Sequence, residues 1–242
     1  MTTDLVTADV SRHLGWMTGG HRFFMAALAQ VSDDQLSAPS ALPGWTGRHI
    51  LSHVGHNARA VGRLAYWAAT GVPTPMYPGP TARAEEIALG AQWDAQRLRL
   101  FVDVEQGALA AALEKLDAEQ WATKVVTAQG RHVTAAALPW LRTRELWIHA
   151  TDLCDAADFS EFPPVLLDDL ISDVLRQRRD ANGEIVLVRP TDRDRTPRFG
   201  GPAPPAWIEG RTADLAGWLT GRGATNIHTS DDSALPTLRP WL

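Results

Sequence analysis

The sequence predicts an α+β protein in which an antiparallel bundle of four long helices precedes a smaller, mixed α/β domain. Long segments with few helix-breaking residues, and with apolar residues at helical spacing, occupy the first two-thirds of the chain. Nine of the 16 prolines follow residue 160, and the strand-like run at 185–188 lies among them. We therefore expect a helical bundle over residues 1–160 and a small α/β domain over residues 161–242.

The four helices of the bundle are each expected between segments rich in proline, glycine or other turn-forming residues. They cover about residues 4–31, 46–70, 82–116 and 138–156, with loops at 37–47 and 71–81 and an irregular or briefly extended segment at 121–133. Thr46 is suited to the N-cap of the second helix. Pro139 is tolerated because it lies in the first turn of the fourth helix.

The second domain is expected to begin with a helix that is opened by prolines. We predict helices over 162–180 and 212–222, and strands over 185–188 and 206–210. Together these elements predict a small, mixed α/β domain.

Composition and charge exclude several classes of protein. With 242 residues, 45% of them hydrophobic and 21% charged, the chain has the composition of a globular protein and not of a disordered one. Its net charge of −5 disfavours nucleic acid and anionic membranes as partners. No apolar stretch reaches about 18 residues, and the N-terminus does not resemble a secretory signal. A single cysteine, Cys154, fits a reducing compartment, and we expect a cytoplasmic monomer.

Glu145 and His149 form the first candidate for a metal site. They are four residues apart in the fourth helix and so lie on one helical face, one turn apart. A carboxylate and an imidazole at this spacing can bind one divalent metal. Because pairs at this spacing are frequent, the spacing alone favours a surface pair, or a hydrogen-bonded pair inside the bundle, over metal binding.

The second helix offers three further histidines, His49, His53 and His56. Its apolar residues define one arc, and Arg48, Ser52, Arg59 and Arg63 define the opposite, polar face. His53 lies at the edge of the apolar arc, whereas the other two histidines lie closer to the polar side. Because an ionisable group inside a bundle needs a partner, His53 is the best inward-facing ligand of the three.

Two histidines and one glutamate make a three-ligand site, which leaves a fourth position on zinc open, as in catalytic sites. Cys154 faces nearly the opposite side of the fourth helix and is expected to be a small buried residue. Asp152, one turn beyond His149, could accept a hydrogen bond from its ring, although a plain surface aspartate fits as well. Arg142 lies near the Glu145–His149 stripe, where it could meet an anionic substrate or form a salt bridge between helices.

Two helical motifs, PGWTGRHILSHVGHNARA and LPWLRTRELWIHATDL, together resemble the mycothiol-dependent maleylpyruvate isomerase family. The segment GRTADLAGWLTGR is similar to the C-terminal signature of that family, so the resemblance covers nearly the whole chain. It implies a bundle similar to the DinB metalloenzymes, followed by a small C-terminal α/β domain.

The resemblance also implies a set of site residues. His53 in LSHV matches the first metal-binding histidine of the family, and Glu145 and His149 in RELWIHA match its glutamate and second histidine. Arg222, at the end of WLTGR, matches a position near the active site of the family. The implied cofactors are a divalent metal, for which this ligand set favours zinc, and the thiol mycothiol.

The implied reaction is the cis–trans isomerisation of maleylpyruvate to fumarylpyruvate in gentisate degradation. An external thiolate adds to the double bond, the chain rotates about the resulting single bond, and expulsion of the thiolate gives the product. Zinc would bind and deprotonate the thiol. The two carboxylates of the substrate call for cations: Arg222 is the first choice, reaching across from the second domain, and Arg142 and Arg83 are weaker ones.

Two other functions fit the same residues. The protein could be a mycothiol S-transferase that acts on other electrophiles, or a non-catalytic, metal-binding regulatory module. Turnover of maleylpyruvate compared with conjugation of a model electrophile separates the first of these from the isomerase. Zinc and thiol binding without turnover would support the second.

Overall fold

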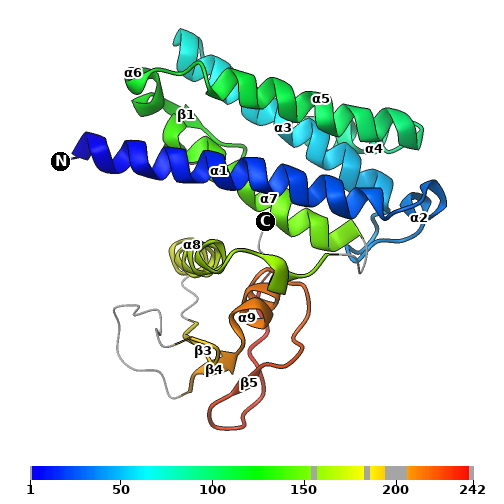
Figure 1. Ribbon diagram of the computed structural model, residues 1–242, viewed down its shortest axis with the longest axis vertical. Helices are drawn as coiled ribbons and strands as arrows, with labels where there is room; N and C mark the ends of the chain where they lie inside the picture. The colour runs from blue at the N-terminus through cyan, green and yellow to red at the C-terminus, as the bar shows by residue number, and fades with distance from the viewer. Residues whose placement is uncertain (1, 154–156, 183–185, 194–205, 240–242) are drawn as a thin grey trace. The chain divides into compact units, whose positions relative to one another are not determined.

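The chain folds into two compact units, Met1–Ala157 and Asp158–Leu242, in a computed structural model that describes residues 2–153, 157–182, 186–193 and 206–239 (Figure 1). The first unit is mostly helical, and the second combines helices with a small sheet. The predicted α+β class is therefore confirmed. The boundary expected at residue 160 falls within the short 3-10 helix η2 (Phe159–Glu161).

The N-terminal unit contains four long helices and several short elements. Its elements are α1 (Thr2–Ala29), α2 (Asp33–Ser37), α3 (Gly47–Thr70), α4 (Ala82–Gly90), α5 (Ala95–Leu113), α6 (Ala118–Ala122), β1 (Lys124–Val126), β2 (His132–Thr134), the 3-10 helix η1 (Ala135–Ala137) and α7 (Leu138–Leu153). β1 and β2 pair as an antiparallel hairpin that overlaps the segment predicted to be irregular or briefly extended and ends one residue beyond it.

The long helices pack in the pairs α1–α7, α3–α5 and α3–α7 (Figure 1). α3 and α7 run antiparallel, since His53 meets Glu145 while Asn57, one turn later in α3, meets Arg142, earlier in α7.

α3 and α5 run parallel, since Arg48 contacts Trp93 near their first turns and Arg59 contacts Glu105 further along both helices. The antiparallel packing predicted for the bundle therefore does not hold for this pair, and the segment between the two helices returns the chain to the end at which α3 began. α4 lies within this connecting segment.

The second predicted helix is confirmed at both ends. Thr46 is the N-cap of α3, and a capping box links it to His49 at the third helical position. Gly71 ends the helix with a left-handed φ of 73°, a conformation that glycine adopts without steric cost.

The single helix predicted over 82–116 is wrong, because the chain breaks between α4 and α5. α4 ends at Gly90, and the side chain of Asp94 caps the new helix by accepting a hydrogen bond from the backbone N–H of Arg97 at 2.8 Å. The break lets α4 fold over α3, where the Ser52 hydroxyl donates to the Ile87 carbonyl at 2.9 Å. Ser52 is therefore fully buried, and its assignment to a polar face was also wrong.

Close approach of α3 and α5 depends on Gly55. A Cβ atom at this position would lie 2.3 Å from the ring of Phe101. The core of the unit continues on both sides of this contact with fully buried aliphatic residues of α3, such as Ile50, Leu51 and Leu64. α3 packs these apolar residues into a core that it shares with α5 and α7, so it lies in the centre of the bundle.

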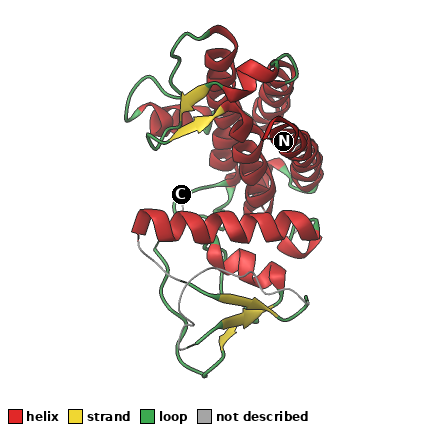
Figure 2. Cartoon of the chain, turned by 90° about the vertical axis from the view of Figure 1, so that its left-hand side faces the viewer, coloured by secondary structure: helices red, strands yellow, loops and turns green. Residues whose placement is uncertain are grey.

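The C-terminal unit is a small sheet with helices on one side. Its elements after η2 are α8 (Pro164–Asn182), β3 (Val188–Pro190), β4 (Ile208–Gly210), α9 (Thr212–Leu219) and β5 (His228–Thr229). β3 pairs parallel to β4, which pairs antiparallel to β5, and α9 lies between α8 and the sheet (Figure 2).

The strand expected at 185–188 is shifted toward the C-terminus in the structure. The paired residues begin at Val188 and end at Pro190, whereas 186 and 187 are not in a strand and 185 lies outside the described residues. β5 was not predicted at all. In the part of the chain that the structure describes, no helix combines the length and apolar character needed to span a membrane.

Candidate metal centre

The three predicted metal ligands meet inside the N-terminal unit, although they come from distant parts of the sequence. Within the described ranges, His53, Glu145 and His149 form a group whose ligand atoms all lie within 4.8 Å of one another. Glu145 Oε2 lies 2.8 Å from His53 Nε2 and 3.3 Å from His149 Nε2. Zinc binds nitrogen and oxygen at about 2.0–2.2 Å, so small adjustments would place all three atoms around one ion.

The local fold explains why these side chains converge. Glu145 and His149 are one turn apart on α7 and share a face. α3 crosses that face in the opposite direction and presents His53, which is 2% exposed. The prediction that His53 points inward is thus confirmed in its geometry, and metal binding by the group remains a proposal.

Asp152 fixes the orientation of His149. Its Oδ2 atom lies 2.8 Å from His149 Nδ1, and the Asp152 residue is 1% exposed. An ionised carboxylate accepts a hydrogen bond from Nδ1–H, so the lone pair is left on Nε2, the atom that faces Glu145. The alternative of a plain surface aspartate is excluded.

Neither of the other two histidines of α3 joins the group. The Nδ1 atom of His49 accepts the backbone N–H of Thr46 at 3.2 Å and so helps to start the helix. His56 is buried under α4 and α5, with its ring 4.8 Å from that of Phe101 and its Nδ1 atom 3.5 Å from Glu86. Its burial was not expected, since the break before α5 was not predicted.

Sequence reasoning missed two aromatic neighbours of the group. The Trp45 ring meets the His53 ring edge-on, with 5.5 Å between centroids. Tyr77, from the loop before α4, is half-buried against the core, and its electrostatic neighbours include Glu145. No helical periodicity applies to loop residues, so only proximity in the fold could reveal them.

Burial and charge set the protonation states in the group. Burial lowers the pKa of His53 to about 4, although Glu145 acts in the opposite direction. Burial acts to raise the pKa of Glu145, but His53 and His149 together hold it well below its ordinary value. Burial acts to lower the pKa of His149, but hydrogen bonds with Asp152 and Glu145 raise it. A neutral His53 and an ionised Glu145 are the forms that bind a metal.

Metal binding is therefore expected to weaken as the pH falls, starting above pH 6.5. A metal must displace a proton from His149, and the raised pKa of that ring means that the proton is held up to a higher pH than in an ordinary histidine. Titration calorimetry with Zn²⁺ from pH 8 to pH 6, in buffers of different ionisation enthalpy, would measure both affinity and proton release. Constant affinity over this range, with no proton released, would contradict the assignment of His149.

Replacing Asp152 by asparagine should weaken zinc binding by about 10–100-fold, the usual effect of losing such a supporting partner. Asparagine has nearly the same shape, so packing around α7 is retained while the negative charge that faces His149 Nδ1 is lost. Competition with a chelator measures the change. The matched control is Asp9→Asn, at a side chain that is 59% exposed on α1, and equal zinc affinity of the two variants would show that Asp152 does not support the site.

Arg142 does not have the role considered for it. The residue is fully buried, and its guanidinium donates to Gln106 Oε1 at 2.8 Å, to Asn57 Oδ1 at 2.8 Å and to the Val54 carbonyl at 2.9 Å. It therefore joins α7 to α3 and α5 through neutral acceptors. The proposed contact with a substrate is wrong, and so is the salt bridge considered as its alternative.

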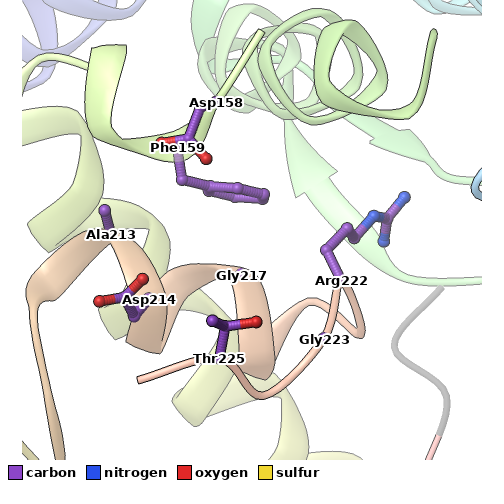
Figure 3. A pocket seen from close by; sticks show the side chains of 8 residues that line it. All are labelled: Asp158, Phe159, Ala213, Asp214, Gly217, Arg222, Gly223 and Thr225. Carbon is purple, nitrogen blue, oxygen red and sulfur yellow. The ribbon is translucent and has the colours of Figure 1, made fainter. Parts of the chain in front are cut away.

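Arg222 lies in the C-terminal unit, in the turn after α9 and not at the end of the helix itself. Gly221 and Gly223 on either side have φ values of 84° and 97°, in the left-handed region. The pocket beside Arg222 has a volume of about 110 Å³ and is lined by Asp158, Phe159, Ala213, Asp214, Gly217, Arg222, Gly223 and Thr225 (Figure 3). An expected role in the active site stays a prediction. Cys154, expected to be buried and not a ligand, lies outside the described residues.

Comparisons with known proteins assign this arrangement to a family. Residues 17–154 match the family described as the mycothiol maleylpyruvate isomerase N-terminal domain. Crystal structures of a mycothiol-dependent maleylpyruvate isomerase and of its histidine-to-alanine mutant are each 30% identical to this chain, with a TM-score of 0.88 over 96% of this chain and 97% of theirs. The comparison with curated proteins gives no match. The chain belongs to the mycothiol-dependent maleylpyruvate isomerase family, a family of isomerase enzymes.

Proposed function

We propose that this protein is a zinc- and mycothiol-dependent isomerase that converts maleylpyruvate to fumarylpyruvate in gentisate degradation. The observation that carries the proposal is the convergence of His53, Glu145 and His149 in a fold that matches the crystal structures of a mycothiol-dependent maleylpyruvate isomerase. We further propose that it acts as a cytoplasmic monomer without nucleic acid or membrane partners. The net charge of −5 argues against nucleic acid and anionic membranes as partners, and the single cysteine fits a reducing, cytoplasmic compartment.

The donor set fits zinc. Two imidazole nitrogens and one carboxylate oxygen are ligands of catalytic zinc sites, and a group of three leaves one position for an external molecule. A zinc ion bound there would hold the thiol sulfur and deprotonate it. The chain's own part is to keep His53 neutral and Glu145 ionised by burial and mutual contact, and to orient His149 through Asp152.

The reaction needs an external nucleophile. The thiolate sulfur forms a bond to one alkene carbon, and the electron pair of the double bond moves onto the adjacent keto group as an enolate. Rotation about the new single bond, return of the electron pair and loss of the same thiolate give the trans isomer, so atoms and charge balance. Cations must hold the two carboxylates while the chain rotates, and we assign one of them to Arg222.

Turnover tests the proposal directly. Purified protein, stripped of metal and reconstituted with Zn²⁺, should isomerise maleylpyruvate when mycothiol is present and should lose activity when either component is left out. Conjugation of a model electrophile without isomerisation would instead show an S-transferase. Binding of zinc and mycothiol with neither reaction would show a non-catalytic module.

Replacing Arg222 by alanine should lower kcat/KM by at least about tenfold while zinc content is retained. A guanidinium binds a carboxylate through two parallel hydrogen bonds, each of which is worth about 1.5–3 kcal/mol, and Arg222→Lys should recover only part of the loss. The matched control is Arg189→Ala in β3 of the same unit, a side chain that is 49% exposed. Normal kinetics of Arg222→Ala, with at most a lowered melting temperature, would limit Arg222 to a structural role in its turn.

A further inference from the structure

The end of α9 shapes the turn in which Arg222 lies (Figure 3). The last four carbonyls of an α-helix have no partner within the helix itself. In α9, three of them accept hydrogen bonds from backbone N–H groups of the turn: Ala216 from Thr220 at 3.1 Å, Gly217 from Arg222 at 2.7 Å and Trp218 from Gly221 at 3.0 Å. The backbone of Arg222 is therefore part of the structure that ends the helix.

The fourth carbonyl, that of Leu219, is bonded from another helix. The Nη2 atom of Arg178, in α8, donates to it at 2.7 Å, and the Nη1 atom of Arg178 donates to the Arg239 carbonyl at 2.9 Å. Arg178 is 2% exposed, and Leu219 is fully buried. A buried guanidinium thus joins α8, the end of α9 and the segment around Arg239, at the end of a helix where a positive charge is favourable.

The orientation of the Arg222 side chain depends on the same peptide groups. Arg222 Nη1 donates to the Thr220 carbonyl at 2.5 Å, and Thr220 follows Leu219 directly. Because a peptide group is planar and rigid, a bond that fixes the Leu219 carbonyl also fixes the position of the Thr220 nitrogen. Gly221 and Gly223, on either side of Arg222, have the wide conformational freedom of glycine, so the shape of the turn depends on such external bonds.

We infer that Arg178 is a positioning residue, which holds the turn after α9 in the form that places Arg222 for binding of the substrate. This inference rests on the proposed function, since it concerns the arginine to which a substrate carboxylate was assigned. Arg178 is buried and acts through Arg222, not on the substrate itself. A guanidinium binds a carboxylate through two parallel hydrogen bonds only in a narrow range of orientations, so a shifted turn would weaken that contact.

Arg178→Met should lower kcat/KM by about tenfold, and by no more than Arg222→Ala does, because a small displacement of a substrate-binding group is costly. Methionine is apolar and removes both hydrogen bonds to the carbonyls. The double variant Arg178→Met/Arg222→Ala should have the kcat/KM of Arg222→Ala, since residues that act through one another are not additive. Zinc content, which depends on the other unit, should be unchanged.

The matched control is Arg193→Met, at the opposite end of the same helix. Arg193 donates to the Thr212 hydroxyl at 3.0 Å and to Asp168 at 2.9 Å, so it also joins α9 to α8. Loss of either guanidinium should lower the melting temperature, but Arg193→Met should keep a kcat/KM near that of the wild type. A general loss of stability would instead affect both variants alike.

Amide hydrogen exchange gives a measurement that does not depend on activity. The N–H groups of Gly221 and Arg222 should exchange faster in Arg178→Met than in the wild type and in Arg193→Met, since the turn is no longer held from α8. Arg178→Lys keeps the charge but not the two-pronged reach of a guanidinium, so both its exchange and its kcat/KM should be intermediate. This variant carries the test if Arg178→Met does not fold.

The inference is overturned if Arg178→Met keeps the wild-type kcat/KM, if Arg193→Met loses as much, or if the losses of Arg178→Met and Arg222→Ala multiply in the double variant. Normal kinetics of Arg222→Ala in an active protein would refute the inference and leave the isomerase function intact. A wild-type protein without isomerase activity would refute the proposed function. In that case, unchanged exchange of the turn in Arg178→Met would overturn the inference as well, and faster exchange would still show that Arg178 holds the turn.

Discussion

His53→Gln is expected to remove most of the bound zinc and to lower kcat/KM by about a thousandfold. His53 is 2% exposed and lies 2.8 Å from Glu145, so no other described histidine of α3 is placed to substitute for it. Metal catalysis contributes several kcal/mol to transition-state stabilisation, and each 1.36 kcal/mol is tenfold in rate. Metal analysis of the purified variant, followed by the isomerase assay with mycothiol, measures both effects.

The matched control for this change is His49→Gln, one turn earlier on the same helix. His49 is the third residue of the capping box with Thr46, and glutamine is well suited to that position, so the start of α3 should be preserved. The control should keep its zinc and its activity. Full zinc content in His53→Gln would contradict the ligand assignment and would direct attention to His56.

Arg142→Leu is expected to lower the free energy of unfolding of the metal-free N-terminal unit by about 3–5 kcal/mol. Its guanidinium satisfies Gln106, Asn57 and the Val54 carbonyl inside the core. Leucine would leave these buried acceptors without a donor, at a cost of about 1–3 kcal/mol each before relaxation. Since a domain is stable by only about 5–15 kcal/mol, this change approaches the limit of folding.

Urea denaturation of metal-free protein measures this effect without a contribution from the metal ion. Arg142→Lys keeps the charge but cannot reach all three acceptors, so it should be intermediate and should still fold if the leucine variant does not. The exposed Arg131→Leu is the control for loss of an arginine. A loss below about 1 kcal/mol in Arg142→Leu would show that the network is not required, as is found when a buried ionic group is well replaced by an apolar one.

The long helices could be predicted where local signals mark their ends. Thr46 and Gly71 mark the ends of α3, and Pro139 lies in the first turn of α7. The break at Gly90 was missed because the window around it is rich in good helix formers and contains no proline. Its cause is partly tertiary: α4 gains its contacts, including the bond from Ser52, only when α3 is already beside it.

The residues of the candidate site also differ in whether the sequence alone could predict their roles. His53 could be selected from the position of its side chain on α3, because periodicity reports which face of a helix is buried. Arg142 was misjudged, because periodicity does not reveal that Gln106 and Asn57 lie opposite it as acceptors. Short strands such as β5 are equally hidden, since pairing with β4 and not local preference creates them.

The wide separation of the ligands along the chain has a consequence for the stability of the folded protein. His53 and Glu145 are 92 positions apart in the sequence. A metal ion bound by both side chains would therefore close a loop of that length without a covalent cross-link. In a chain-entropy treatment, a permanent cross-link around such a loop opposes unfolding by about 4–5 kcal/mol, and a reversible ion adds stability in proportion to the logarithm of its free concentration. A bound ion would thus act as a reversible cross-link, and its free concentration would affect the free energy of unfolding of the protein as well as its activity.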